Sequence, residues 1–323
     1  MTEEERATSE PEDTTAEQEK LSPQQEKNGK SKKKVIAISV GVAVVAIAIA
    51  AICFWYFQFK VPYDQAVENY NAAIENYRAE IAALEERSSQ LESDIASLQT
   101  VIDSEEQPLD EALLTSAGAI IGEAQGARAL VPEIPEMPTE TEAINRATTE
   151  INTKAEEVAA QGNYSQILAE LADAQETLET SIQQMNQVTN PTEQFVIERI
   201  QGLPSIAGVQ AVTEDHDPNG NLNKQGGYTA TVYFSSDLID QSEVFGDDIV
   251  DKATEGGGAV EVYRTVEEAE ARDTYLSAFD GGILSSGSHV VCGTVVIRTS
   301  NLLTASQQQA LTDSIREALI EIR

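Results

Sequence analysis

Short oxygen-bearing side chains alternate along one stretch of the chain, a spacing suited to binding a cation. Asp215, Asp217 and Asn219 precede Gly220 and reproduce the first half of an EF-hand calcium loop. Gly226 stands at the twelfth position, where such loops place a bidentate glutamate. The same residues are typical of an Asx-rich turn between two strands, and we favour that interpretation. Calcium at Asp215, Asp217 and Asn219 is the one cofactor hypothesis that the sequence offers.

Cys292 and His289 raise the question of thiol catalysis. Residues three apart on a strand point to opposite faces, so this thiol and this imidazole should not meet. A thiol within a valine-rich run is typically buried and unreactive. His216 is the other histidine, and no nucleophile elbow accompanies either histidine. The sequence therefore predicts a noncatalytic protein, with no catalytic residue.

The element that fixes where this chemistry is displayed is an unbroken apolar run from Val35 to Phe57. Its 23 residues match the roughly 20 that cross a bilayer core as one helix. A signal peptide has a shorter apolar stretch that ends at small residues. Lipidation at Cys53 is disfavoured because Ile52, a large residue, precedes it. We therefore predict one transmembrane helix at residues 35–57.

The residues that flank this run predict its orientation. Lys32, Lys33 and Lys34 precede it, and Trp55 and Tyr56 lie at its other end. Basic residues stay on the cytoplasmic side, and aromatic rings gather at membrane interfaces. We expect these five residues to mark the two interfaces. The protein would then be a single-pass protein of the cell membrane, with a cytoplasmic N-terminus and an extracellular C-terminal domain.

Charge is distributed unevenly on either side of the span. The chain has 21 Lys and Arg against 55 Asp and Glu, and residues 1–34 hold only 9 of these acids and 7 of these bases. The outer part therefore has a net charge of −32, which repels nucleic acid and attracts cations and basic partners. Residues 1–34 lack apolar periodicity and are predicted to be a disordered cytoplasmic tail. Thr14, Thr15 and Ser22 offer phosphorylation sites there.

Beyond the membrane, apolar residues recur in alternating steps of four and three, as in a heptad repeat. The repeat, with one serine in it, consists of Tyr63, Val67, Tyr70, Ile74, Tyr77, Ile81, Leu84, Ser88, Leu91, Ile95, Leu98 and Ile102. β-Branched residues at one seam position and Tyr or Leu at the other favour a coiled coil in a parallel homodimer. The same seam could pack instead against later helices of its own chain. Both arrangements stay open for a helical stalk at residues 61–190.

Three later amphipathic segments supply helices for such a bundle. They cover Leu109–Leu130, Glu140–Ala160 and Tyr164–Val188. Prolines interrupt the helical pattern between the first and the second. Gly162 and Asn163 mark a turn between the second and the third, which predicts an antiparallel helical hairpin.

The composition changes at Asn190 and Pro191, which predicts a separate head domain at residues 191–323. Its 133 residues are enough for one core. Helices are expected at 193–202, at 240–253, after Thr265 and after Thr304; strands are expected near 207–213 and at 227–235, 258–263 and 289–298. The expected result is a two-layer α/β (α+β) domain, with 289–298 as a central strand that is apolar on both faces.

Five segments of the sequence carry a resemblance to a known family. They are "VTNPTEQFVIERI", "AVTEDHDPNG", "GGYTATVYFSSDLIDQS", "GGGAVEVYRTVEEAEARDTYLSAFDGG" and "SGSHVVCGTVVIRTSNLLTASQQQAL". The chain resembles membrane-anchored surface proteins of Gram-positive bacteria that are loosely labelled Ebh-like, after matrix-binding surface proteins. The resemblance covers the head and, less specifically, the tyrosine-rich start of the stalk. It implies a surface role and transfers no ligand and no functional residue.

Two functional hypotheses follow from these expectations. The first is a noncatalytic surface protein that presents a small binding domain on a helical stalk to a protein or cell-wall partner. The alternative is a single-pass transmembrane regulator that couples an external ligand to the phosphorylatable cytoplasmic tail.

Overall fold

The computed structural model describes residues 31–282, 285 and 287–323, with side chains described from Gly41 onward. Most of the predicted cytoplasmic tail and the side chains of Lys32, Lys33 and Lys34 therefore lie outside the described residues. The chain divides into two compact units. One comprises the residues up to Asn71 together with Met137–Ala147, and the other comprises Ala72–Glu136 together with Thr148–Arg323.

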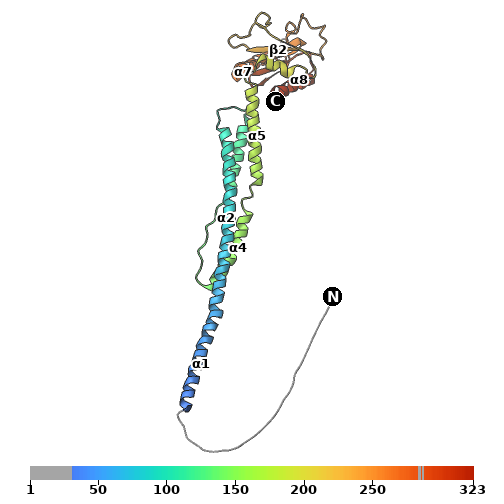
Figure 1. Ribbon diagram of the computed structural model, residues 1–323. Helices are drawn as coiled ribbons and strands as arrows, with labels where there is room; N and C mark the ends of the chain where they lie inside the picture. Colours follow the sequence, from blue (N-terminus) through green and yellow to red (C-terminus); the bar gives the residue numbers. More distant parts are fainter. Residues whose placement is uncertain (1–30, 283–284, 286) are drawn as a thin grey trace, which may run out of the picture. The chain divides into compact units, whose positions relative to one another are not determined.

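The first unit contains the predicted membrane span. Helix α1 (Ser31–Trp55) leads into a short π-helical segment, η1 (Tyr56–Lys60), and then into α2 (Val61–Ile102) (Figure 1). The large apolar side chains of α1 from Val42 onward are exposed. Within the described part of the chain, this is the one helix long and apolar enough to cross a bilayer. Trp55 and Tyr56, predicted at the outer interface, end α1 and begin η1.

Pro62 gives a physical reason for the π-helical segment. A proline has no N–H to donate four residues back, and its ring crowds the carbonyl at that position, here that of Gln58. The backbone widens locally, so that the Val61 N–H donates to the Tyr56 carbonyl, five residues earlier. The helical backbone thus continues from the apolar segment into α2.

The second unit contains most of the helical stalk. Helices α3 (Ala112–Gly126), α4 (Thr141–Ala160) and α5 (Ser165–Gln187) lie close to the predicted positions. One apolar cluster joins α2, α3 and α5 and contains Leu91, Ile95, Leu98, Ala117, Ile121, Ala124, Leu171, Leu178 and Ile182. The heptad seam of α2 is therefore covered by helices of its own chain along this stretch. This is the intrachain bundle; a coiled coil is not what the structure shows.

The antiparallel hairpin predicted for α4 and α5 is wrong. Helix α5 packs against α3, and α4 and α5 run in the same direction, one after the other (Figure 1). Gly162, with a left-handed φ of +68°, lies at the break between them. A Cβ at this position would overlap the side chain of Leu84, so the break closely approaches α2. Gly162 interrupts the helix without reversing the chain.

Ser88, the one polar residue of the seam, has a partner across the bundle. Its hydroxyl lies 3.3 Å from the hydroxyl of Tyr164, which also accepts the Ala129 N–H at 2.9 Å. Leu84 and Leu91, the seam residues before and after Ser88, are fully buried. The serine thus makes room for a tyrosine of the same chain and satisfies its hydroxyl.

The head is built on a five-stranded antiparallel sheet. Its strands are β1 (Ile206–Ala211), β2 (Ala230–Ser236), β3 (Gly257–Val262), β4 (His289–Cys292) and β5 (Val295–Thr299). Their order is β1-β2-β3-β5-β4, so β3 is the middle strand and β4 an edge strand. Three helices accompany the sheet: α6 (Glu193–Ile200), α7 (Val266–Ser277) and α8 (Ala305–Ile320).

Side chains alternate along each strand, so each face of the sheet has its own set of apolar residues. Helices pack against both faces. Val232, Val260 and Ile297 face α6 and α8 in the main core. Val296, on the other face, packs in a separate cluster with Ala269 of α7. The helix-plus-sheet class expected for the head is present, but the two-layer arrangement is incomplete, since α7 adds a third layer.

Two predicted head elements are wrong. Residues 240–253 form turns, followed by a 3₁₀ turn, η2 (Ala253–Gly256), because Asp240 accepts local turn hydrogen bonds and Gly246 has a φ of +134°. The run 289–298 is a hairpin. Gly293 adopts a left-handed φ of +58° there, and the hydroxyl of Thr294 donates to the Val188 carbonyl. Only the second half of the run forms β5, a buried strand that lies between β3 and β4 in the sheet.

The predicted helix starts are confirmed. Thr265 accepts the Glu268 N–H at the start of α7. Thr304 and Gln307 form a reciprocal capping box at the start of α8.

Candidate functional site

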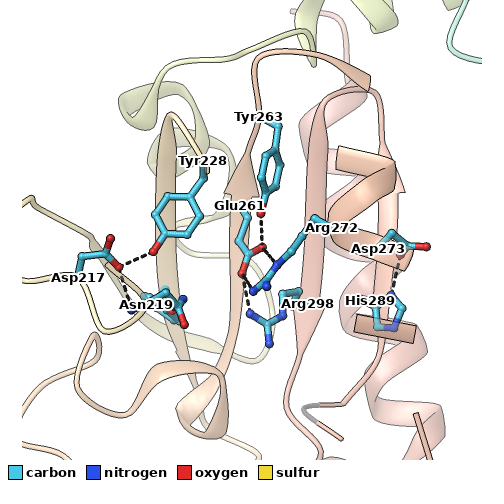
Figure 2. A network of polar contacts seen from close by, with 10 residues as sticks. Asp217, Asn219, Tyr228, Glu261, Tyr263, Arg272, Asp273, His289 and Arg298 are labelled. Atoms are coloured by element: carbon cyan, nitrogen blue, oxygen red, sulfur yellow. Dashed lines mark hydrogen bonds and ion pairs between the residues drawn. The ribbon is translucent and has the colours of Figure 1, made fainter. Parts of the chain in front are cut away.

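Asp217, at the centre of the predicted calcium loop, already accepts hydrogen bonds from other groups of the protein. Its carboxylate accepts the Asn219 N–H at 3.0 Å, the Leu222 N–H at 2.8 Å and the hydroxyl of Tyr228. Partial burial alone would raise the pKa of Asp217, but the hydrogen bonds from Tyr228 and from the backbone lower it below its ordinary value. Asp217 therefore ties the loop to the sheet as an ionised acceptor (Figure 2).

The other two predicted ligands do not complete a calcium site. Asp215 is exposed, and Asn219 donates from its side-chain amide to the hydroxyl of Tyr233 at 3.0 Å. Calcium needs six to eight oxygen ligands that are free to coordinate it. The three residues do not fit the ion, and their bonds are those of an Asx turn.

His216, within this loop, lies between the carboxylates of Asp248 and Asp251. Its Nε2 is 2.9 Å from Asp251 Oδ1, and its Nδ1 is 3.7 Å from Asp248 Oδ2. The hydrogen bond to Asp251 and the nearby charges raise the pKa of His216. These three residues are the one His and carboxylate group in the described chain with metal-ligand spacing. Asp248 also accepts the Gln210 amide at 2.9 Å and the Asp251 N–H at 2.9 Å, so the group is a hydrogen-bonded cluster that joins two loops.

Cys292 and His289 lie on opposite faces of β4, as predicted. The thiol belongs to the main core, and burial raises its pKa. The imidazole of His289 lies 2.6 Å from Asp273 of α7 and 3.3 Å from Asp280. The two side chains cannot act together on one substrate.

A buried network of charged side chains occupies the face of the sheet that α7 covers. Glu261, on the middle strand β3, is fully buried. Arg272 of α7 donates to it from Nε at 2.8 Å and from Nη2 at 2.9 Å. Arg298 of β5 donates from Nη1 at 2.6 Å, and the hydroxyl of Tyr263 donates at 2.9 Å (Figure 2). One carboxylate thus links two strands and a helix.

These contacts fix the charge states in the network. Burial alone would raise the pKa of Glu261, but the hydrogen bond from Arg272 and the charge of Arg298 lower it. Burial and the charge of Glu261 raise the pKa of Tyr263. Burial by itself would lower the pKa of Arg272, and its bond to Glu261 raises it instead. At neutral pH the network therefore holds a carboxylate, guanidinium groups and a neutral phenol.

Sequence reasoning missed this network, although a signal was available. Glu261 lies between Val260 and Val262, and Arg298 follows Ile297. A charged residue inside an apolar strand needs a buried partner, since an unpaired buried charge is very costly. The sequence does not single out their partner Arg272, because it lies on a helix that contains several other charged residues.

A pocket of about 510 Å³ opens beside the network. Its lining is Asn219, Asn221, Gly226, Gly227, Tyr263, Glu268, Ala271, Arg272 and Tyr275. The volume falls within the roughly 300–1,000 Å³ of small-molecule sites. Amide, carboxylate, guanidinium and phenol groups converge on it from the loop before β2, from Tyr263 just after β3 and from α7. Asn219, singled out as a calcium ligand, is thus a lining residue of this pocket.

Two glycines form one side of the pocket. Gly226 has a left-handed φ of +72°. A Cβ on Gly227 would overlap the carbonyl oxygen of Asn221. The chain can pass this closely only without side chains, so a stretch of bare backbone faces the pocket.

A second pocket, of about 600 Å³, lies in the stalk at the break between α4 and α5. Its lining includes Ala159, Ala160 and Gly162, and the guanidinium of Arg87 there donates to the Gln161 carbonyl at 3.2 Å. Arg87 is the one charged residue in its lining, whereas the head pocket is lined by charged groups of both signs, Glu268 and Arg272. We take the head pocket as the candidate functional site, because a few convergent polar groups distinguish binding sites.

No protein-family model, curated protein or solved structure matches the chain. The resemblance to Ebh-like surface proteins therefore stays a prediction, and the function is argued from the site.

Proposed function

We propose that the protein is a noncatalytic, single-pass surface protein of the cell membrane whose head binds a partner through the head pocket. The observation that carries this proposal is the uninterrupted helical backbone from α1 through η1 into α2. An apolar helix that is fully exposed in the chain needs a lipid environment, because water-exposed apolar surface of this size is unfavourable. The helix that follows it leads directly into the stalk.

The orientation rests on charge. Lys32, Lys33 and Lys34 precede the apolar segment, and basic residues are retained in the cytoplasm. The part that follows carries a net charge of −32. In this orientation the N-terminal tail is cytoplasmic, and the stalk and head are outside the cell membrane.

The partner we propose is a protein or a cell-wall component, in keeping with the resemblance to Gram-positive surface proteins. The acidic outer part disfavours nucleic acid, whose phosphates would be repelled. The head pocket offers hydrogen-bonding groups and an exposed aromatic ring, Tyr275, which are typical of recognition sites.

Epitope accessibility tests the topology. A tag after Arg323 should be reached by antibody on intact, wall-stripped cells, whereas a tag before Met1 should be reached only after permeabilisation. The reverse pattern, or recovery of the full chain from the soluble fraction, would contradict the proposal.

A transmembrane regulator is the second candidate, and the continuity of α1, η1 and α2 favours it as well. A rigid helix could transmit a rotation or a shift from the stalk to the cytoplasmic tail. Ligand-dependent crosslinking of the full chain in membranes distinguishes the two. A crosslinking pattern that changes with ligand, with a tail required for the cellular response, favours the regulator. An unchanged pattern with an expendable tail favours the surface-binding protein.

A further inference from the structure

We propose that the head pocket binds an uncharged saccharide unit. This inference rests on the proposed function and specifies its ligand: a sugar ring lies against Tyr275 while Asn221, Glu268 and Arg272 hydrogen-bond its hydroxyl groups. Three properties of the pocket lead to this chemistry: an aromatic platform, a mixed set of donors and acceptors, and a balance of charge.

The platform is the ring of Tyr275 on α7. The residue is 57% exposed, although it is a large aromatic side chain on a packed helix. Its ring is held by neighbours, with the Arg272 guanidinium 5.5 Å from its centroid and the Phe279 ring 5.1 Å away, edge to face. A fixed, exposed aromatic ring suits a ligand with an apolar C–H face and a polar rim, because such a ligand covers the ring without burying its own hydroxyls.

The polar groups around this ring can both donate and accept. Asn221 brings an amide N–H₂ and a carbonyl oxygen to the lining, and its side chain makes no hydrogen bond within the described part of the chain. Glu268 uses Oε2 for the Arg264 N–H at 3.1 Å, which leaves Oε1 as an acceptor. Sugar hydroxyls donate and accept at once, so they match such a set better than a ligand with donors alone.

The charge balance favours a neutral ligand. Glu268 brings a negative charge to the pocket and Arg272 a positive one, and the charge of Arg272 is bound to buried Glu261. An anionic ligand would meet no uncommitted cation and would approach through the field of an acidic protein. A cationic ligand would meet the guanidinium at the pocket wall. The bare backbone of Gly226 and Gly227, which also lines the pocket, leaves room for a sugar ring to approach closely.

The experiment is a binding screen with the full-length chain in lipid nanodiscs. Saturation-transfer-difference NMR is recorded with four uncharged probes: maltotriose, cellotriose, triacetylchitotriose and mannotriose. At least one should bind with a saturable signal, and Tyr275→Ala should weaken it about tenfold through loss of the platform. Tyr275→Phe keeps the ring and should retain most of the affinity. Phe245→Ala is the matched control, since Phe245 is an aromatic residue of the head, 94% exposed and outside the pocket.

Asn221→Asp provides a second variant that does not depend on the platform. It keeps the shape of the side chain, removes its donor and adds a charge, so saccharide binding should again fall. The inference is overturned if no probe binds, if Tyr275→Ala leaves binding unchanged, or if Phe245→Ala weakens it equally. If a surface protein or a basic peptide binds in a Tyr275-dependent way while no saccharide does, the ligand assignment fails and the proposed function stands. If the tag after Arg323 proves cytoplasmic, the proposed function fails whatever the pocket binds.

Discussion

Glu261 on β3 and Arg272 on α7 form a two-point ion pair, with Nε 2.8 Å from Oε2 and Nη2 2.9 Å from Oε1. The pair holds α7 against the sheet and fixes the guanidinium beside which Tyr275 lies. A two-point contact sets the direction of the guanidinium plane as well as its distance. The wall of the head pocket is therefore positioned by a residue, Glu261, that is not itself a lining residue.

Glu261→Gln should destabilise the head by about 3–5 kcal/mol, because the change leaves buried guanidinium groups without their carboxylate. Native-state hydrogen exchange of the β3 and β5 amides in the full-length protein measures this opening free energy. Glu270→Gln, on the exposed face of α7, is the control and should change it by less than about 0.5 kcal/mol. Equal effects of the two substitutions would show that the buried pair is not what holds the head together.

His216 should titrate above its ordinary pKa of about 6.5, because it bonds to Asp251 and lies near Asp248. A raised folded-state pKa stabilises the fold below about pH 6.5, and this contribution is lost as the pH rises through the folded pKa. NMR titration of the imidazole measures the shift. Asp251→Asn should lower the pKa toward the ordinary value, whereas Asp237→Asn, at an exposed aspartate that does not act on His216, should leave it unchanged. A pKa at or below 6.5 in the unmodified protein would refute the ion-pair assignment.

Asp217→Ala should destabilise the head by about 1–3 kcal/mol, since it removes the acceptor of several partly buried donors. Millimolar calcium should not shift the melting temperature of the unmodified protein, because these oxygens are already bonded. Differential scanning calorimetry with and without calcium measures both effects. A calcium-dependent rise that Asp217→Ala abolishes would restore the calcium site predicted from Asp215, Asp217 and Asn219.

Gly162→Ala and Gly118→Ala should have opposite effects on the stalk. The first forces a Cβ into Leu84 at a φ of +68° and should cost more than about 1 kcal/mol. The second lies within α3 with open space around it and should stabilise by about 0.5–1 kcal/mol. Thermal unfolding of the full-length protein, followed by circular dichroism at a helix wavelength, compares them. Destabilisation of similar size by both would mean that the α4–α5 break is not packed against α2 in this way.

Local patterns were enough to place many elements. The apolar run from Val35, the heptad seam of α2 and the caps at Thr265 and Thr304 are set by residues within a few positions of each other. Helix periodicity and capping are short-range effects, so the sequence displays them directly. The same logic placed His289 and Cys292 on opposite faces of a strand, because side chains alternate there.

Two local readings failed where turn residues competed with periodicity. The alternation from His289 to Arg298 predicts one strand, yet Gly293 adopts a left-handed φ and folds the run into a hairpin. Residues 240–253 hold apolar positions compatible with a helix, but Asp240 and Gly246 stabilise turns instead. In both places a few turn residues outweigh a weak periodic signal.

The sequence alone determined that the chain has an apolar span, a helical stalk and a mixed head, since each depends on hydrophobic pattern along the chain. Only the tertiary structure decided that the α2 seam packs on α3 and α5 of the same chain, because a heptad pattern is equally satisfied by a second copy. Only the tertiary structure brought Glu261, Arg272 and Arg298 together and opened a pocket beside them. These residues are 11 and 37 positions from Glu261, and such pairings depend on strand order and on the placement of α7, which no local pattern encodes.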